Sequence, residues 1–227
     1  MLILGIDTSG KSGGVILAEA GGHNFRVLGS APIAGGTFSA QLVPTVARLL
    51  QQHRVGVRDL GGFAAASGPG SFTGLRVGLS AVKGLAEVLR KPIVTVSLLE
   101  ALASLSPAGG SVIAALDAGR SEIFFGLYEV AGGVATQVTE QLLSGTDFVE
   151  KLKSPGIAMF VTSDANLAEL ACTTQVKAQV IGRPDSSVVA RIGARKLLAG
   201  ENVAAEVLDA NYLRRSDAEL FFKGHRS

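Results

Sequence analysis

The fold of this chain follows from one short stretch near its beginning, Leu2-Ile3-Leu4-Gly5-Ile6-Asp7-Thr8-Ser9. Residues 2–6 form an apolar run of strand length. A polar, glycine-rich turn follows at residues 7–14, and a second apolar run comes at residues 15–18. Two apolar runs joined by turn residues predict a β-hairpin with a polar tip.

The same unit returns in the second half of the chain. The apolar residues 112–116 lead to Asp117-Ala118-Gly119, and residues 123–129 form another strand-like run. Asp117 follows Asp7 by 110 residues (117 − 7 = 110). A strand, a turn containing aspartate and a second strand, repeated at this interval, predict a duplicated two-lobe fold. Chance is the alternative, because hairpins with aspartate in the turn are common.

Helices and strands alternate between the two hairpins. Helical spacing of apolar residues predicts helices over residues 39–53 and 73–89, and a third from residue 185 or 186 to Gly200. Short apolar runs predict strands at residues 63–66, 93–96 and 157–162. We therefore expect an α/β fold with helices covering the sheets. The lobes are predicted at residues 1–103 and 104–227, with the C-terminal segment able to pack back on the first lobe.

Composition limits the classes of protein that this chain can belong to. Of its 227 residues 47% are hydrophobic and 18% are charged, which favours a large core over disorder. The net charge of +2 is too weak to predict direct nucleic-acid binding, so another protein is expected to hold most of any RNA. The N-terminus lacks a basic signal-peptide region, and no apolar run approaches the roughly 18 residues of a membrane helix. We expect a cytoplasmic protein with no membrane partner.

Metal and thiol chemistry are not predicted. His23, His53 and His225 lie far apart, and no pair of histidines has the spacing of a helix-borne metal site. The single cysteine, Cys172, can form no internal disulfide and is expected to be a small buried hydrophobic residue. A Gly-x-Ser-x-Gly motif is also absent from the sequence, which argues against a serine hydrolase.

The first hairpin turn has two interpretations. A strand that ends in Asp7-Thr8-Ser9 can hold a magnesium-bound phosphate, because the carboxylate orients metal-bound water and backbone N–H groups face the phosphate. The same residues are typical of an Asx turn, in which the side chains bond the hairpin's own backbone. The matching Asp117 strengthens the phosphate interpretation without deciding between the two.

The strongest local motif is Ser67-Gly68-Pro69-Gly70-Ser71-Phe72-Thr73-Gly74-Leu75-Arg76. A Gly-Pro-Gly turn joins a buried strand to a helix start, where Ser71 and Thr73 are candidate caps. The motif predicts either an anion site at the helix N-terminus, helped by Arg76, or a rigid turn that places the helix. It is not a P-loop, because the Gly-Lys-Ser/Thr ending is absent.

The two first-lobe helices carry a candidate partner surface. Glycine in a helix costs about 1 kcal/mol relative to alanine, so small residues there indicate that something packs closely against them, either the protein's own sheet or a partner helix. We predict that the two helices pack side by side and meet a second subunit. The predicted interface residues are Leu42, Val46, Leu49, Gly74, Gly78 and Ala81.

Four segments, in the expected order, resemble the TsaB (YeaZ) family. They are residues 3–9, residues 67–76, residues 115–124 and the closing Tyr212-Leu213-Arg214. The resemblance implies an actin/Hsp70-like (ASKHA) two-lobe fold and a role in placing threonylcarbamoyl on the tRNA adenosine beside the anticodon. It implies a non-catalytic subunit that pairs with the catalytic homologue TsaD, together with the ATPase TsaE, and forms homodimers through first-lobe helices. Contact with tRNA is expected only indirectly, through the complex.

Two departures from the related enzymes weaken any chemistry of the chain's own. Thr37-Phe38-Ser39 stands near the position of the catalytic relative's His-x3-His metal pair. The adenosine loop of actin-like ATPases is represented only by residues 162–165, which contain no glycine. We expect no metal and no cofactor, with weak ATP or ADP binding only within the complex.

On this interpretation the two hairpins are vestigial phosphate-binding sites, and the residues that belong to them are Asp7, Thr8, Ser9 and Asp117. One rival is an actin-fold ATPase or kinase that uses Asp7, Thr8, Lys11 and Asp117. The other is a metallopeptidase of the same superfamily, for which the sequence supplies no ligands.

Overall fold

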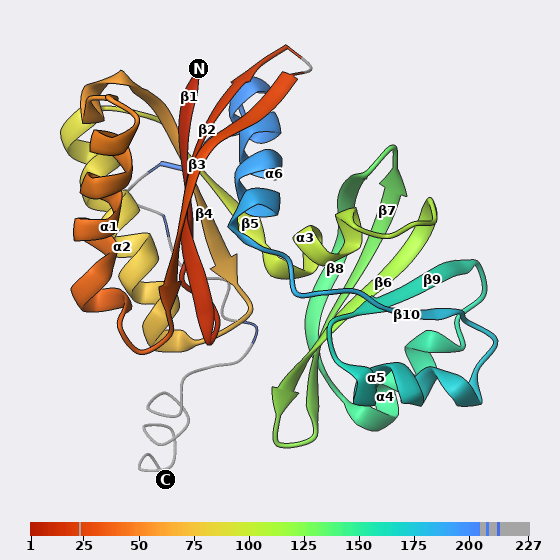
Figure 1. The fold of residues 1–227 in the computed structure, drawn as a ribbon. Helices are drawn as coiled ribbons and strands as arrows, with labels where there is room; N and C mark the ends of the chain where they lie inside the picture. Colours follow the sequence, from red (N-terminus) through yellow and green to blue (C-terminus); the bar gives the residue numbers. More distant parts are fainter. Residues whose placement is uncertain (23, 205–207, 209–212, 214–227) are drawn as a thin grey trace, which may run out of the picture. The chain divides into compact units, whose positions relative to one another are not determined.

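The computed structural model describes residues 1–22, 24–204, 208 and 213, and these form two compact units (Figure 1). The first unit comprises residues 1–98 together with residues 184–204, and the second comprises residues 99–183. The units divide after Leu98, slightly before the predicted boundary at 103. The segment that returns to the first unit begins at Pro184. The closing Tyr212-Leu213-Arg214 motif lies outside the described residues except for Leu213.

The first unit is built on a five-stranded sheet in the order β3-β2-β1-β4-β5. Strands β1, β2 and β3 pair antiparallel as a meander, whereas β4 and β5 run parallel to β1. The strands are β1 Leu2–Asp7, β2 Ser12–Gly21, β3 Asn24–Ala34, β4 Leu60–Gly68 and β5 Ile93–Ser97.

Helices cover both faces of this sheet. Helices α1 (Phe38–Gln52) and α2 (Phe72–Leu89) lie side by side on one face, and α6 (Ser186–Leu198) lies on the other (Figure 1). Helix α6 approaches the sheet closely, because a Cβ added to Gly5 would lie 2.7 Å from the Cβ of Ala190. The sheet is thus buried on both sides, which explains the nearly continuous apolar sequence of β1 and β4.

The second unit repeats this plan with a sheet in the order β10-β9-β6-β7-β8. Helix α4 (Gly145–Leu152) follows the third strand, and α5 (Ala165–Leu170) with the 3-10 helix η2 (Ala171–Thr173) follows the fourth. The side chain of Phe148 on α4 packs edge-on against Phe125 and Phe160, with ring centroids 6.4 and 5.3 Å away. The strands are β6 Gly110–Gly119, β7 Glu122–Ala131, β8 Val134–Ser144, β9 Ile157–Thr162 and β10 Ala178–Val180.

The two sheets have the same topology. Numbered within its own unit, each sheet has the strand order 3-2-1-4-5, with three antiparallel strands followed by two parallel ones. The predicted duplication is therefore confirmed, and the fold is the α/β, actin/Hsp70-like two-lobe fold. The remaining elements of the described chain are the 3-10 helix η1 (Val57–Asp59) and helix α3 (Leu98–Ser104). Within the described residues, none of the helices is long and apolar enough to cross a membrane.

Candidate functional site

The turn that follows β1 is buried and bonded to itself. Asp7, Thr8 and Ser9 are exposed by only 2%, 2% and 1%. The carboxylate oxygen Oδ1 of Asp7 accepts hydrogen bonds from the backbone N–H of Ser9, at 2.8 Å, and from the Ser9 hydroxyl. This is the Asx turn that was one of the two interpretations of the sequence. The Ser9 N–H, which the phosphate interpretation would aim at a ligand, is thus bonded to a side chain of the same turn.

Helix α2 and the loop before it close over this turn. The Ser71 N–H donates to the Ser9 carbonyl at 2.7 Å, and the Thr8 hydroxyl donates to the Gly74 carbonyl at 2.7 Å. The Ser71 hydroxyl also caps the helix by accepting from the Gly74 N–H at 3.3 Å. Ser71 is therefore the cap that the sequence predicts, whereas Thr73, the other candidate, lies inside α2.

The close approach depends on three glycines spaced four residues apart, Gly70, Gly74 and Gly78, which we call the glycine face. A Cβ added at any of them would lie closer than 3.0 Å to an atom of Thr8 or Ser9. Gly74 and Gly78, at positions i and i+4, fall on one side of α2, and Gly70 lies in the loop just before the N-cap Ser71, so all three present backbone to the turn. The glycine face corrects one prediction, since Gly74 and Gly78 pack against their own chain and not against a partner.

Other residues of the motif have structural partners as well. The guanidinium carbon of Arg76 lies 3.9 Å from the centroid of the Phe72 ring, as a cation–π contact within the first turn of α2. Gly68 has a φ of 110°, a conformation that favours glycine, where the chain turns into Pro69. The motif Gly68-Pro69-Gly70-Ser71-Phe72-Thr73-Gly74 with Arg76 thus corresponds to the rigid turn that was the alternative to an anion site.

The second hairpin is more open than the first. Asp117 is exposed, and its Oδ1 accepts from the Gly119 N–H at 2.8 Å. Arg120 and Ser121 close the hairpin with φ angles of 57° and 61°. In the loop between β9 and α5, Asp164 caps the helix by accepting from the Asn166 N–H at 2.8 Å. Each unit has an Asx-type turn after its first strand, but only the first is covered by a glycine-bearing helix.

The predicted partner residues on α1 point inward. Leu42, Val46 and Leu49 are exposed by 1%, 7% and 1%, and α1 contacts β2, β3 and α2. These side chains line the core of the first unit, so their assignment to a partner surface is wrong. The helix has two adjoining apolar stripes, and the sequence does not distinguish which of them faces the sheet. The outward stripe contains Val43, which is 66% exposed.

On α2 the outward residues are also different from those predicted. Val88 is 84% exposed, and a Cβ added at Gly84 would meet no atom within 4 Å. Ala81 is half-buried beside them. The large exposed apolar side chains of these two helices are therefore Val43 on α1 and Val88 on α2, with Gly84 one turn before Val88.

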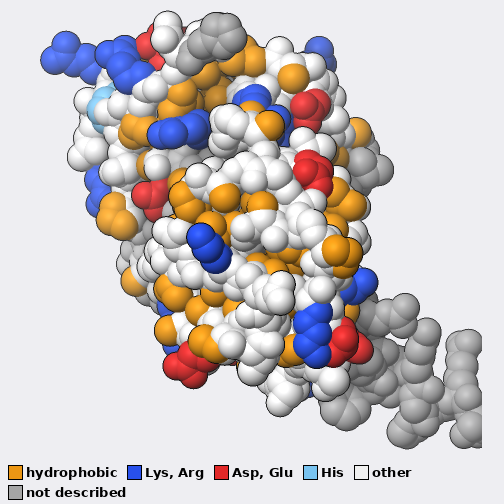
Figure 2. Space-filling model, turned by 90° about the vertical axis from the view of Figure 1, so that its right-hand side faces the viewer, with side chains coloured by type: hydrophobic (Ala, Val, Ile, Leu, Met, Phe, Trp, Pro, Cys, Tyr) orange, Lys and Arg blue, Asp and Glu red, His pale blue; other side chains and the backbone are white. Residues whose placement is uncertain are grey.

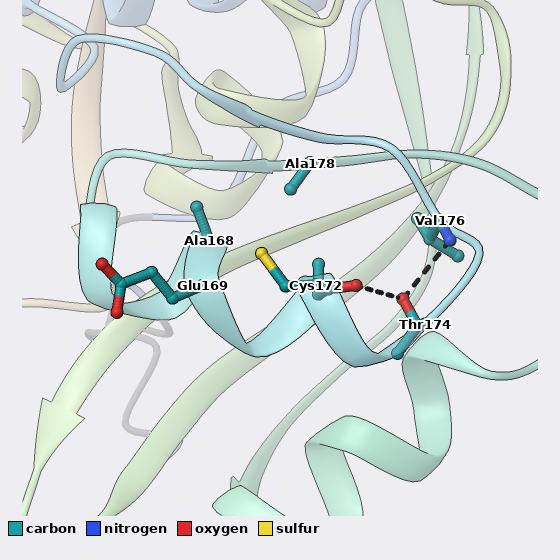
Figure 3. Close-up of a pocket in the computed structure, with 7 residues that line it drawn as sticks. Ala168, Glu169, Cys172, Thr174, Val176 and Ala178 are labelled. Carbon is teal, nitrogen blue, oxygen red and sulfur yellow. Dashed lines mark hydrogen bonds between the residues drawn. The ribbon is translucent and has the colours of Figure 1, made fainter.

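The expectation for Cys172 is wrong. Cys172 is exposed on η2, and it borders a depression between α5 and β10 that is lined also by Ala168, Glu169 and Val176 (Figure 3). The Thr174 hydroxyl closes one end of this segment by donating to the Ala171 carbonyl at 2.8 Å. In the sequence Cys172 follows two apolar residues, and this context does not show that the short helix η2 lies at the surface.

Metal ligands are the remaining part of the site. In the part of the chain that the structure describes, three or more His, Cys, Asp or Glu side chains nowhere gather in a way that could hold a metal ion. His23 and His225 lie outside the described residues. The absence of a metal stays a prediction that elemental analysis of the purified protein can test.

Comparisons with known proteins agree with this architecture. The family model described as TsaD, tRNA N6-adenosine threonylcarbamoyltransferase, matches residues 32–217. The tRNA threonylcarbamoyladenosine biosynthesis protein TsaB of Bacillus subtilis is 31% identical over 96% of this chain and 96% of its own length. A tRNA N6-adenosine threonylcarbamoyltransferase of a Methylobacterium strain is 48% identical, over 25% of this chain and 16% of its own length. The solved structure of YeaZ from Pseudomonas aeruginosa superposes with a TM-score of 0.75 at 26% identity, covering 93% of this chain and 99% of YeaZ. The duplicated fold, the motif over residues 67–76 and these matches together show that the chain belongs to the TsaB (YeaZ) family, whose members take part in the biosynthesis of threonylcarbamoyladenosine in tRNA.

Proposed function

We propose that this chain is a non-catalytic subunit that supports a TsaD homologue in the threonylcarbamoylation of tRNA adenosine in the cytoplasm, with the ATPase TsaE as a third component. The observation that carries this proposal is the closed Asp7–Ser9 turn. Its carboxylate, hydroxyl and N–H groups bond one another, and the glycine face covers them. A phosphate would have to displace these buried bonds, which cost free energy to break without replacement.

The partner surface that we propose is the outward side of α1 and α2. Val43 and Val88 are large exposed apolar side chains, and Gly84 leaves space for a close approach. Glycine at an exposed helix position costs about 1 kcal/mol relative to alanine, and no atom of the described chain uses the space that it leaves. A TsaD homologue would bury these residues, and a homodimer of this chain would compete for the same surface.

The experiment substitutes the exposed valine and a matched polar neighbour. Val43→Arg places a charge in the proposed interface, and Gln41→Arg places the same charge two residues earlier, about 200° around the helix. Both positions are exposed, so both variants should fold. Val43→Arg should lose co-purification with a tagged TsaD homologue and lose tRNA modification in the reconstituted reaction, whereas Gln41→Arg should retain both.

Two results would count against the proposal. If Val43→Arg folds, binds TsaD as the wild type does and supports modification, α1 does not form the interface. If the chain alone transfers threonylcarbamoyl from threonylcarbamoyl-adenylate to tRNA, the chain is a catalyst and not a supporting subunit.

A further inference from the structure

Helix α1 ends in a motif that usually contains glycine, but an arginine stands at the glycine position. The N–H of Arg54 donates to the Gln51 carbonyl at 3.0 Å, and the N–H of Val55 donates to the Leu50 carbonyl at 3.0 Å. These two bonds are those of a Schellman motif, in which the residue in the left-handed conformation is usually glycine. Here that residue is Arg54, with a φ of 55°.

Helix α2 ends in the same way. The N–H of Arg90 donates to the Glu87 carbonyl at 3.4 Å, and the N–H of Lys91 donates to the Ala86 carbonyl at 3.1 Å. The left-handed residue is Arg90, with a φ of 53°. A side chain at such a position is less favourable than glycine. Two neighbouring helices therefore each carry an arginine where glycine would suit the backbone better.

The two arginines lie at the same end of the first unit. Helices α1 and α2 run in the same direction, and both end on the side of the sheet where the chain begins (Figure 1). His53 lies over Gly29 of β3, while Lys91 lies two residues before the start of β5. The pairing register places both points on one row across the five strands. That row is Gly29, Leu17, Leu4, Phe63 and Ile93. Five strands span about 19 Å, which is the approximate width of the sheet between these two points.

Further cations surround these two. Arg48 and Arg58 are exposed near the end of α1, and Lys91 is half-buried beside Arg90. We call Arg48, Arg54, Arg58, Arg90 and Lys91 the basic end. None of the five side chains makes an ion pair with an acidic residue in the part of the chain that the structure describes. Figure 2 shows Lys and Arg side chains gathered at the upper-left edge of the molecule, beside a histidine.

The local charge differs from that of the whole chain. The nearby acidic residues in the same segments are Asp59 and Glu87, so five positive charges less two negative ones leave +3 in the basic end and its flanks. The whole chain carries only +2. A net charge averaged over 227 residues therefore conceals a concentrated positive surface.

We propose that the basic end binds the phosphate backbone of tRNA directly. The guanidinium group is suited to this role because its planar set of donors bonds phosphate oxygens in pairs. A surface up to about 19 Å wide can meet several phosphates of one strand. This inference rests on the proposed function, which supplies tRNA as the polyanion, and it replaces the expectation of purely indirect contact. The basic end borders the proposed TsaD surface, because Val88 lies two residues before Arg90 in the last turn of α2.

The test uses a double variant, Arg54→Gly with Arg90→Gly. It removes two charges and places glycine where the backbone favours it, so the variant should be at least as resistant to heat as the wild type. The matched control is Arg120→Gly in the second unit, which also replaces a left-handed arginine, at φ 57°. Binding of fluorescent tRNA is measured at several salt concentrations for the complex with the TsaD homologue and for the chain alone. Co-purification with TsaD is measured in parallel.

The double variant should bind tRNA about tenfold or more weakly, with the slope of log K against log salt reduced by roughly 1.5 to 2. The control should bind as the wild type does, and both should keep TsaD. Unchanged affinity in the double variant would overturn the proposal, and so would an equal loss in the control. Loss of binding to vesicles of phosphatidylcholine with phosphatidylserine, without a change in tRNA affinity, would show a membrane surface instead. If the wild-type chain does not bind TsaD, the proposed function is refuted. The present inference is then decided separately, by measuring tRNA binding to the chain alone and to its double variant.

Discussion

The substitution Gly78→Ala tests whether α2 owes its position to the glycine face. In a helix this change alone should stabilise the chain by about 1 kcal/mol, because alanine is the better helix former. Here the new methyl group would lie closer than 3.0 Å to the Thr8 hydroxyl oxygen, which is buried and bonded to Gly74. Thr8 is short and enclosed, so it has little freedom to move away.

The opposing terms can be compared in size. Overpacking a buried contact costs about 1–3 kcal/mol, and weakening a buried hydrogen bond adds about 1 kcal/mol. Set against the gain of about 1 kcal/mol in helix propensity, the net result should be a loss of about 1–3 kcal/mol. Gly84→Ala, six residues later in the same helix, has open space around the new methyl group and should instead stabilise by about 0.5–1 kcal/mol.

Urea unfolding of the four combinations of Thr8→Ala and Gly78→Ala separates the clash from other effects. Thr8→Ala removes the oxygen that the methyl group would strike, and the Thr8 Cβ would then lie 3.4 Å from it, an ordinary contact. Gly78→Ala should therefore be neutral or stabilising in the Thr8→Ala background, which gives a coupling energy of about 1–3 kcal/mol. If Gly78→Ala stabilises the wild type as Gly84→Ala does, or costs the same in both backgrounds, the reasoning about the glycine face is refuted.

Three further predictions concern separate parts of the chain. Asp185 caps α6, and hydrogen bonds from the Ser187 hydroxyl and from the Ser187 and Val188 N–H groups lower the pKa of its carboxyl group. Asp185→Ala should lower the free energy of unfolding by about 1 kcal/mol near pH 7. Because the pKa of Asp185 is lower in the folded than in the unfolded chain, this difference should shrink as the pH falls below about 4. Urea unfolding at several pH values measures the difference, and one that does not vary with pH would contradict the assignment. Cys172, being exposed, should react fully with a thiol reagent in the native protein, and a reaction that needs denaturant would show that it is buried. The isolated chain should bind ATP with a Kd well above about 1 μM, and calorimetry that finds tighter binding would revive the ATPase alternative.

The elements that the sequence predicts are those with a strong apolar pattern. The hairpin strands, the first-unit helices α1, α2 and α6, and the strands β4, β5 and β9 follow from runs or periodicities that a buried face imposes. The sequence did not predict β3 and β8, which are edge strands with few buried residues. Strand β3 contains Gly29 and Pro32, which an edge position tolerates and which weaken any strand pattern.

The candidate site was harder to predict for a different physical reason. Sequence spacing shows that Gly74 and Gly78 share one side of a helix, but it does not show what that side meets. The two apolar stripes of α1 raise the same problem, because Leu42 and Val43 are both apolar and only the first is buried. In each case the missing information is the rotation of a helix about its own axis, which contacts distant in sequence determine. For α2 that contact is with Thr8, 66 residues away from Gly74.

The motif over residues 67–76 also shows why a long motif need not indicate catalysis. Its glycines are required where α2 touches the first turn, Ser71 caps the helix, and Gly68 provides the turn into Pro69. Each of these residue types is demanded by a backbone contact within the same unit. The second unit has the same strand order but no glycine between β9 and α5, and its aspartate turn stays exposed. The difference between the two halves of this duplicated fold is therefore a difference in packing. In the first half, glycine allows a helix to occupy the space beside the aspartate turn, and the described part of the second half has no helix in the corresponding place with glycine at its start.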